Sequence, residues 1–155
     1  MMTDTIRTNA IGNAFENASR IAAEVARNGG PVDLLAQLAV ASRGILEDSG
    51  RVAEYLDAID LDLKAVEDNH LFGMSAGDIL ERVERNRGAA GYLARSVEKL
   101  TLDMFIDAEN HAESEALSSA VYDLHVKVTR HASDVADTGR RYLAAIDAEQ
   151  SLSVE

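Results

Sequence analysis

Residues 35–70, LAQLAVASRGILEDSGRVAEYLDAIDLDLKAVEDNH, carry the clearest pattern in this chain. Positions there recur at alternating spacings of three and four residues, and most of them are apolar. Side chains with these spacings share one face of a helix, so the pattern predicts a coiled-coil-like helix over about residues 31–72. Gly73 is placed to end it. The recurring positions are Leu35, Leu38, Ser42, Ile45, Ser49, Val52, Leu56, Ile59, Leu63, Val66 and His70.

Two segments on either side show the same periodicity. About residues 4–28 form a helix with an alanine-rich seam, and the Gly29-Gly30-Pro31 sequence is expected to stop it. About residues 76–108 form another helix, which Ser75 and Asp78 open with the spacing of a capping box.

A fourth helix is predicted over about residues 111–149, with residues 150–155 frayed at its end. Between residues 108 and 116 the apolar phase is lost, although no glycine or proline marks the break. A turn is therefore expected there, and one continuous helix from 76 to 148 is the alternative.

Two glycines, Gly88 and Gly91, lie inside the third predicted helix, where each costs about 1 kcal/mol relative to alanine. We interpret them as sites of close packing against the alanine face of the first helix. A kink is the alternative.

The composition agrees with an all-α fold. Apolar residues make up 46% of the 155 residues and charged residues 27%, with one proline and no tryptophan. The abundance of good helix formers and the shortage of aromatic bulk disfavour sheet. We predict a single domain, residues 1–155, built as an antiparallel bundle of long coiled-coil-like helices. Because such slender helices carry few large side chains, a homodimer is expected to complete the core.

Absences narrow the functional classes. The chain has no cysteine, no apolar run of the ~20 residues that span a bilayer, and no basic and apolar start typical of a signal peptide. We therefore expect a cytoplasmic protein without disulfides and without a membrane segment. No nucleotide-binding or nucleophile-elbow motif is present, so we predict neither enzymatic activity nor a cofactor.

The net charge is −12, distributed as −6 over residues 1–75, −2 over 76–112 and −4 over 113–155. Because no segment is basic, direct nucleic-acid binding is not expected. Many cations have a carboxylate four positions earlier, which is the favourable order on an exposed helix. These pairs are Glu16–Arg20, Glu47–Arg51, Asp60–Lys64, Glu81–Arg85, Asp123–Lys127 and Asp137–Arg141.

The histidines do not form a convincing metal site. Glu67 and His70 match the Glu-x-x-His spacing of di-iron bundles, but the motif occurs once and such sites need it twice. In an antiparallel bundle His70, His111 and His131 lie at different heights. No metal is predicted, although a ligand at His70 or His131 is left open.

Two groups of polar residues are candidate sites. The first is an acidic stretch offset only by Lys64, which we interpret either as a solvated helix surface or as a docking surface for a basic protein partner. It comprises Glu54, Asp57, Asp60, Asp62, Glu67 and Asp68. The second is a buried polar layer of Ser49, Asn86 and His131, which take seam positions at similar predicted heights. Such a layer specifies register and partner in coiled coils; a pH-sensitive or ligand site at His131 is the alternative.

These features favour a non-enzymatic protein–protein interaction module, such as an adaptor, chaperone, regulator or phage-type inhibitor. A structural coiled-coil oligomer and a metal- or small-ligand-binding bundle are the alternatives.

Overall fold

The computed structural model describes residues 4–110 and 115–154, and over these residues it consists of helices with no strand. The all-helical prediction is confirmed, and the third and fourth segments are separate helices packed against each other. The four helices are α1 (Asp4–Arg27), α2 (Asp33–Glu67), α3 (Ala76–Asn110) and α4 (Glu115–Val154).

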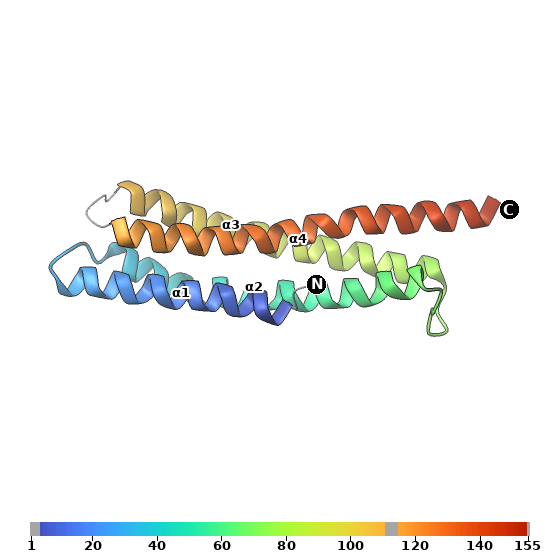
Figure 1. The fold of residues 1–155 in the computed structure, drawn as a ribbon, viewed down its shortest axis with the longest axis horizontal. Coiled ribbons are helices and arrows are strands. Elements are labelled where there is room, and N and C mark those ends of the chain that lie inside the picture. Colours follow the sequence, from blue (N-terminus) through green and yellow to red (C-terminus); the bar gives the residue numbers. More distant parts are fainter. Residues whose placement is uncertain (1–3, 111–114, 155) are drawn as a thin grey trace.

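The helices form an elongated bundle in which each runs back along the previous one (Figure 1). α1 has 24 residues, whereas the other three have 35 to 40, so α1 covers only one half of the bundle. Its backbone lies against α2 and α4, whereas the backbone of α3 is farther away. The molecule is therefore a four-helix bundle at the end away from the α2–α3 turn and a three-helix bundle at the end near it.

Three apolar clusters follow one another along the bundle axis. The first contains Ile45 and Leu124 with the buried face of α1, the second is built around Val52 and Val135, and the third around Leu63. Nearly all the predicted seam positions of α2 are buried or half-buried, because apolar side chains spaced by three and four turn toward the same neighbours. Coiled-coil packing of these side chains stays a prediction.

Helix ends show where local chemistry overrode the predicted bounds. α1 ends as expected: Gly29 has φ +85°, and the amide of Gly30 donates to the carbonyl of Val25 at 2.9 Å. α2 ends at Glu67, earlier than the predicted residue 72. Asn69 adopts φ +57°, and the amide of His70 donates to the carbonyl of Ala65 at 2.9 Å. This is the same type of left-handed cap, with asparagine in place of glycine.

The remaining bounds differ by small amounts. Ser75 caps α3 as predicted, since its Oγ accepts the amide of Asp78 at 3.1 Å. α3 continues to Asn110 and α4 to Val154, beyond the predicted ends at 108 and 149. No glycine or proline interrupts residues 148–154, so nothing in the backbone stops the helix. The predicted start of the fourth helix at 111 and the last residue of the tail lie outside the described residues.

Candidate docking face between α3 and α4

The predicted acidic docking surface does not form one free patch. Asp62 is buried, with 6% of the residue exposed, and the guanidinium of Arg82 on α3 donates to both of its carboxylate oxygens at 2.8 Å. This contact raises the pKa of Arg82. The interaction stabilises the α2–α3 packing, so Asp62 is a structural residue.

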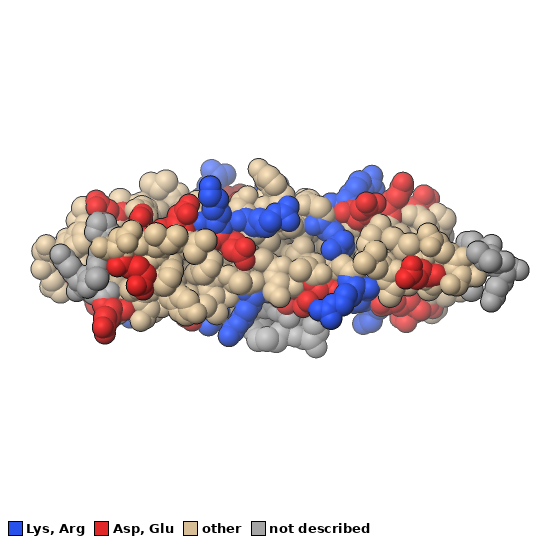
Figure 2. Space-filling model, turned by 90° about the horizontal axis from the view of Figure 1, so that it is seen from above, with Lys and Arg blue, Asp and Glu red and all other residues tan. Residues whose placement is uncertain are grey.

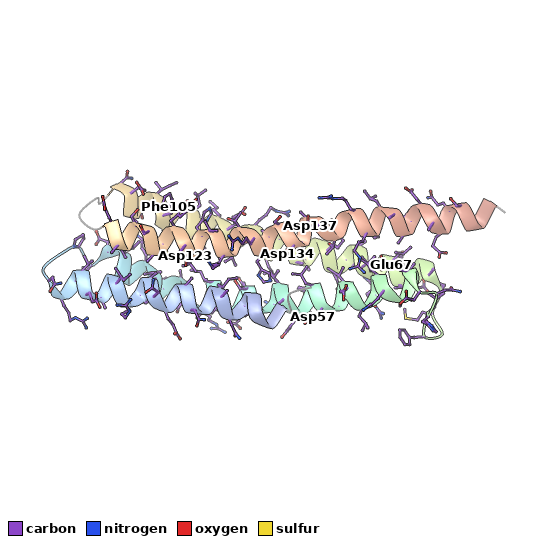
Figure 3. The ribbon with its side chains drawn as sticks, viewed as in Figure 1. Asp57, Glu67, Phe105, Asp123, Asp134 and Asp137 are labelled. Carbon is purple, nitrogen blue, oxygen red and sulfur yellow. The ribbon has the colours of Figure 1, made fainter. Side chains whose placement is uncertain are left out.

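Asp60 and Glu67 are also engaged within the chain. Arg141 on α4 donates to Oδ1 of Asp60 at 2.7 Å and to both carboxylate oxygens of Glu67, the shorter bond being 2.8 Å. The hydrogen bonds to Glu67 are the main reason that the pKa of Arg141 is raised. Arg141 thus closes the α2–α4 seam in the half of the bundle that α1 does not reach. Of the predicted surface, Glu54, Asp57, Glu67 and Asp68 are exposed, but Glu67 binds Arg141. Asp57 lies on the outer side of α2 (Figure 3).

The predicted polar layer is only partly brought together. Ser49 lies between Ile45 of the first cluster and Val52 of the second, and His131 lies between Val128 and Val135 of the same two clusters. Both are buried, with 2% and 3% exposure. A buried polar side chain therefore lies at the boundary between the first and second clusters on both α2 and α4.

Asn86 belongs elsewhere. It is half-buried and lies between Val83 of the third cluster and Ala90 of the second, which is a different boundary along the axis. The predicted position of Asn86 along the bundle axis was wrong. The prediction assumed that the end of α3, placed at residue 108, lies level with the start of the second helix. The packing of Val83 and Ala90 sets the register instead.

The other histidines have distinct surroundings. His70 is exposed in the turn after α2, and His111 lies outside the described residues. His125 is half-buried, and its Nδ1 lies 2.9 Å from Oγ1 of the buried Thr101. Among the described residues, no group of three or more His, Asp or Glu side chains could hold a metal ion.

Packing α3 against α4 brings two basic segments together. Residues 82–99 of α3 lie beside residues 127–141 of α4, as the bond between Arg87 and Thr138 and the cluster of Ala94 with Val135 show. The two segments hold nine of the fifteen Lys and Arg residues of the chain and four of its acidic residues. The nine are Arg82, Arg85, Arg87, Arg95, Lys99, Lys127, Arg130, Arg140 and Arg141.

Seven of these cations form what we call the basic belt, namely all of them except Arg82 and Arg141, which bind carboxylates of α2. Two members are partly neutralised within α4: Lys127 contacts Asp123 at 2.9 Å and Arg140 contacts Asp137 at 3.6 Å. Figure 2 shows basic side chains gathered over the middle of the molecule, with acidic side chains toward both ends. A protein of net charge −12 therefore presents a local cationic surface.

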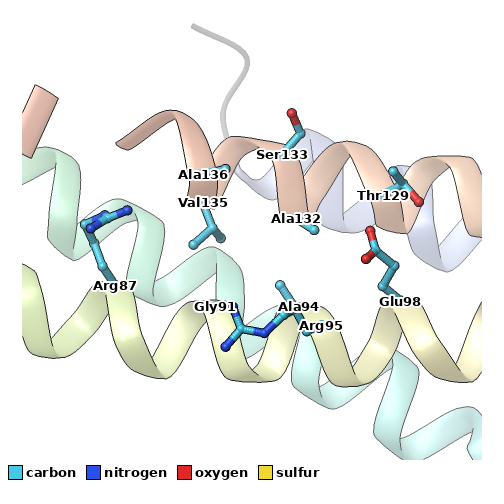
Figure 4. A pocket seen from close by; sticks show the side chains of 10 residues that line it. All are labelled: Arg87, Gly91, Ala94, Arg95, Glu98, Thr129, Ala132, Ser133, Val135 and Ala136. Carbon is cyan, nitrogen blue, oxygen red and sulfur yellow. The ribbon is translucent and has the colours of Figure 1, made fainter. Parts of the chain in front are cut away.

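An open groove of about 480 Å³ lies between α3 and α4, and two cations of the belt, Arg87 and Arg95, line it. Its walls are formed largely by small residues, Gly91 and Ala94 on α3 and Ala132 and Ala136 on α4. Figure 4 shows Arg87 at one end of the groove, the guanidinium of Arg95 folded back toward Gly91, and Glu98 with Thr129 at the other end. The complete lining is Arg87, Gly91, Ala94, Arg95, Glu98, Thr129, Ala132, Ser133, Val135 and Ala136.

Arg87 is held in a fixed orientation. Its Nε donates to Oγ1 of Thr138 at 2.9 Å, and its guanidinium carbon lies 5.6 Å from the ring centroid of Tyr142, a cation–π distance. Thr138 donates its own hydroxyl hydrogen to the carbonyl of Val135 at 2.6 Å, so its oxygen is oriented to accept from Arg87. Burial, assisted by the carboxylate of Glu84, raises the pKa of Tyr142 and keeps its ring neutral beside the guanidinium.

A polar line leads from the other end of the groove into the core. Oγ1 of Thr101 lies 3.2 Å and 3.0 Å from the carbonyl oxygens of Val97 and Glu98, so its single hydrogen is donated there. Nδ1 of His125 must then carry the hydrogen of the Thr101–His125 bond. Nε2 of His125 is left to accept from the hydroxyl of Thr129, at a long 3.5 Å.

Sequence reasoning missed this face, and one of its signals was misinterpreted. Gly88 and Gly91 do not pack against the first helix, since the backbones of α1 and α3 do not come close to each other. A Cβ at Gly88 would meet nothing within 4 Å, whereas a Cβ at Gly91 would lie 3.3 Å from Nη1 of Arg95. Adding the charges of the segments that face each other in an antiparallel pair would have revealed the belt.

Comparison with protein-family models, curated proteins and solved structures found no match for this chain. Of the helices in the described part of the chain, none combines the length and apolar character required to cross a bilayer.

Proposed function

We propose that this chain is a non-enzymatic protein–protein interaction module and that its docking face for an acidic partner is the α3–α4 face. The observation that supports this proposal is the basic belt, two of whose cations line a groove, in a protein of net charge −12. Like charges elsewhere on the surface repel acidic partners, so a single cationic face restricts both where and how they bind. Complementary charge also raises the association rate. Binding in the cytoplasm agrees with the absence of cysteine from the sequence.

The α3–α4 face is favoured over the acidic stretch of α2. Asp60, Asp62 and Glu67 are occupied by arginines of the chain itself, which leaves three dispersed carboxylates. The belt keeps five cations, Arg85, Arg87, Arg95, Lys99 and Arg130, that join no ion pair among the described residues.

A pair of matched variants tests the choice of face. The belt variant replaces Lys99, Arg130 and Arg95 with glutamate, and the control variant replaces Glu54, Asp57 and Asp68 with glutamine or asparagine. Each protein is used to capture partners from its native cell, followed by mass spectrometry and a salt titration. We expect the belt variant to lose the specific partner and the control to retain it with unchanged salt dependence. Loss of the partner only in the control would overturn the choice and favour the acidic stretch.

Homodimerisation is the second part of the proposal. On α3, exposed Leu102 and Ile106 flank Phe105, whose ring lies 5.2 Å from that of Tyr122 on α4. This apolar patch is a surface that a second copy could cover. Light scattering at micromolar concentration should give about twice the chain mass of 16.7 kDa, and Ile106→Lys should lower it toward the monomer. A monomeric wild-type protein would refute assembly and, with it, the structural-oligomer alternative.

A further inference from the structure

Two glycines inside helices make room for the arginines of the groove. A Cβ on Gly139 would lie 2.6 Å from Nη2 of Arg87, closer than any real contact, and one on Gly91 would lie 3.3 Å from Nη1 of Arg95. Each glycine costs about 1 kcal/mol of helix stability relative to alanine. At both positions the atoms that a Cβ would meet belong to a guanidinium group, so a methyl group there would displace the end of the arginine side chain.

The two guanidinium groups are separated by about one helical turn along the groove. Arg87 lies against Gly139 and Thr138 of α4, at its own height on α3. Arg95 folds back over Gly91, four positions from Arg87 (Figure 4). At ~1.5 Å per residue, four positions correspond to about 6 Å.

Carboxylates at positions i and i+4 of a helix have the same axial separation, and they lie on one face. Most side chains between the two cations are small, at Gly91, Ala94, Ala132 and Ala136, and Val135 and Ser133 also line the groove, so a helix backbone can approach closely. The groove therefore fits the helix-in-groove mode of recognition.

Other anionic occupants fit less well. A nucleic acid needs a continuous track of cations along its phosphates, whereas the groove lining holds only Arg87 and Arg95, with acidic Glu98 at one end.

We propose that the α3–α4 groove binds an acidic helix of the partner, with Arg87 and Arg95 each taking one of two carboxylates spaced by four residues. This inference rests on the proposed function for its choice of face. It adds the secondary structure and the charge spacing of the partner segment.

Synthetic peptides test the spacing directly. The probe is a fluorescent, alanine-based helical peptide of about 20 residues with glutamates at i and i+4, long enough to form a helix. Its isomer carries the same glutamates at i and i+2, which places them on opposite faces. We expect the i,i+4 peptide to bind the full chain roughly three- to tenfold more tightly in fluorescence anisotropy. Equal binding of the two isomers, or tighter binding of a single-stranded oligonucleotide, would overturn the inference.

Gly139→Ala tests the position of Arg87 without removing a charge. The added methyl group must displace the end of Arg87 but improves helix propensity, so we expect unchanged or higher stability together with roughly three- to tenfold weaker binding of the i,i+4 peptide. Gly50→Ala on α2 is the matched control, because a Cβ there meets nothing within 4 Å, and it should keep full binding. Peptide binding by Gly139→Ala at the wild-type level would refute the role of Arg87.

The two proposals can fail separately. Suppose that the belt variant loses the native partner, but Gly139→Ala captures it as well as the control Gly50→Ala does. The proposed docking face is then supported, and the acidic-helix inference fails. If the belt variant captures the partner normally, the proposed function fails at this face.

Discussion

Arg82→Met isolates the contribution of the contact that replaces the predicted docking role of Asp62. Methionine keeps the unbranched apolar stem of arginine but removes both hydrogen bonds, each 2.8 Å long, to the carboxylate. Only 9% of the Asp62 side chain is exposed, so the carboxylate cannot recover its hydration where it lies. The substitution therefore leaves a buried charge without its main partner, which is a destabilising condition.

The expected loss is about 2 kcal/mol of unfolding free energy. A hydrogen bond to a charged group contributes ~1.5–3 kcal/mol, so two such bonds would give ~3–6 kcal/mol if both partners were buried. The Arg82 side chain is 42% exposed, however, and water screens the pair and competes for the guanidinium. A loss of about 2 kcal/mol lowers the melting temperature by roughly 4–8 °C in a chain of this size.

Urea unfolding followed by circular dichroism measures the effect. Arg43→Met is the control, because Arg43 pairs with Glu47 on the surface with 87% and 52% of their side chains exposed, and its removal should leave the midpoint unchanged. Replacing Asp62 by leucine together with Arg82→Met should recover much of the loss, since no buried charge remains. If Arg82→Met unfolds at the same urea concentration as Arg43→Met, the structural role assigned to Asp62 is wrong.

Three further predictions address other parts of the molecule. Ala18→Leu should cost about 1–3 kcal/mol, because Ala18 is fully buried in the α1 seam, whereas Asn17→Leu on the exposed side should not lower the urea midpoint. The raised pKa of Tyr142 means that the folded state disfavours its phenolate, so the associated stability is complete below about pH 10 and is lost as the pH rises through the folded-state pKa. In a tyrosinate absorbance titration, Tyr142→Phe should remove a component that titrates above the ordinary range of tyrosine, and loss of a component within that range would contradict this assignment. Arg141→Gln should speed amide hydrogen exchange in the last two turns of α2 roughly fivefold by opening the α2–α4 seam, with no change at the α1 amides.

Surface ion pairs show a limit of prediction from spacing alone. Asp123–Lys127 forms as expected from the i,i+4 rule, but Arg20 pairs with Glu24 and Glu47 with Arg43. Arg141 binds Asp60 and Glu67 of α2 in place of Asp137, the partner that the spacing predicted. The local rule says which partners are within reach on one helix, and it contains no information about carboxylates that another helix brings closer.

The sequence by itself determined the helices and their buried faces. The three–four periodicity of residues 35–66, the Gly29 stop and the Ser75 cap depend on interactions within a turn or two, so they can be read along the chain. Where an equally local signal was overlooked, as with Asn69 at the end of α2, the predicted bound was wrong by a few residues.

The tertiary structure alone decided which side chains meet. Asp62 lies on an acidic stretch in the sequence, but in the fold Arg82 neutralises it. Residues 82–99 and 127–141 are far apart in the chain, and neither segment looks like a binding site when counted with its acidic neighbours. The basic belt exists because α4 runs back along α3 and brings the cations of both helices side by side. Small residues line the groove between the two helices. Helix formation depends on local chemistry, whereas a surface that joins two helices depends on their relative register, which the packing of the whole core sets.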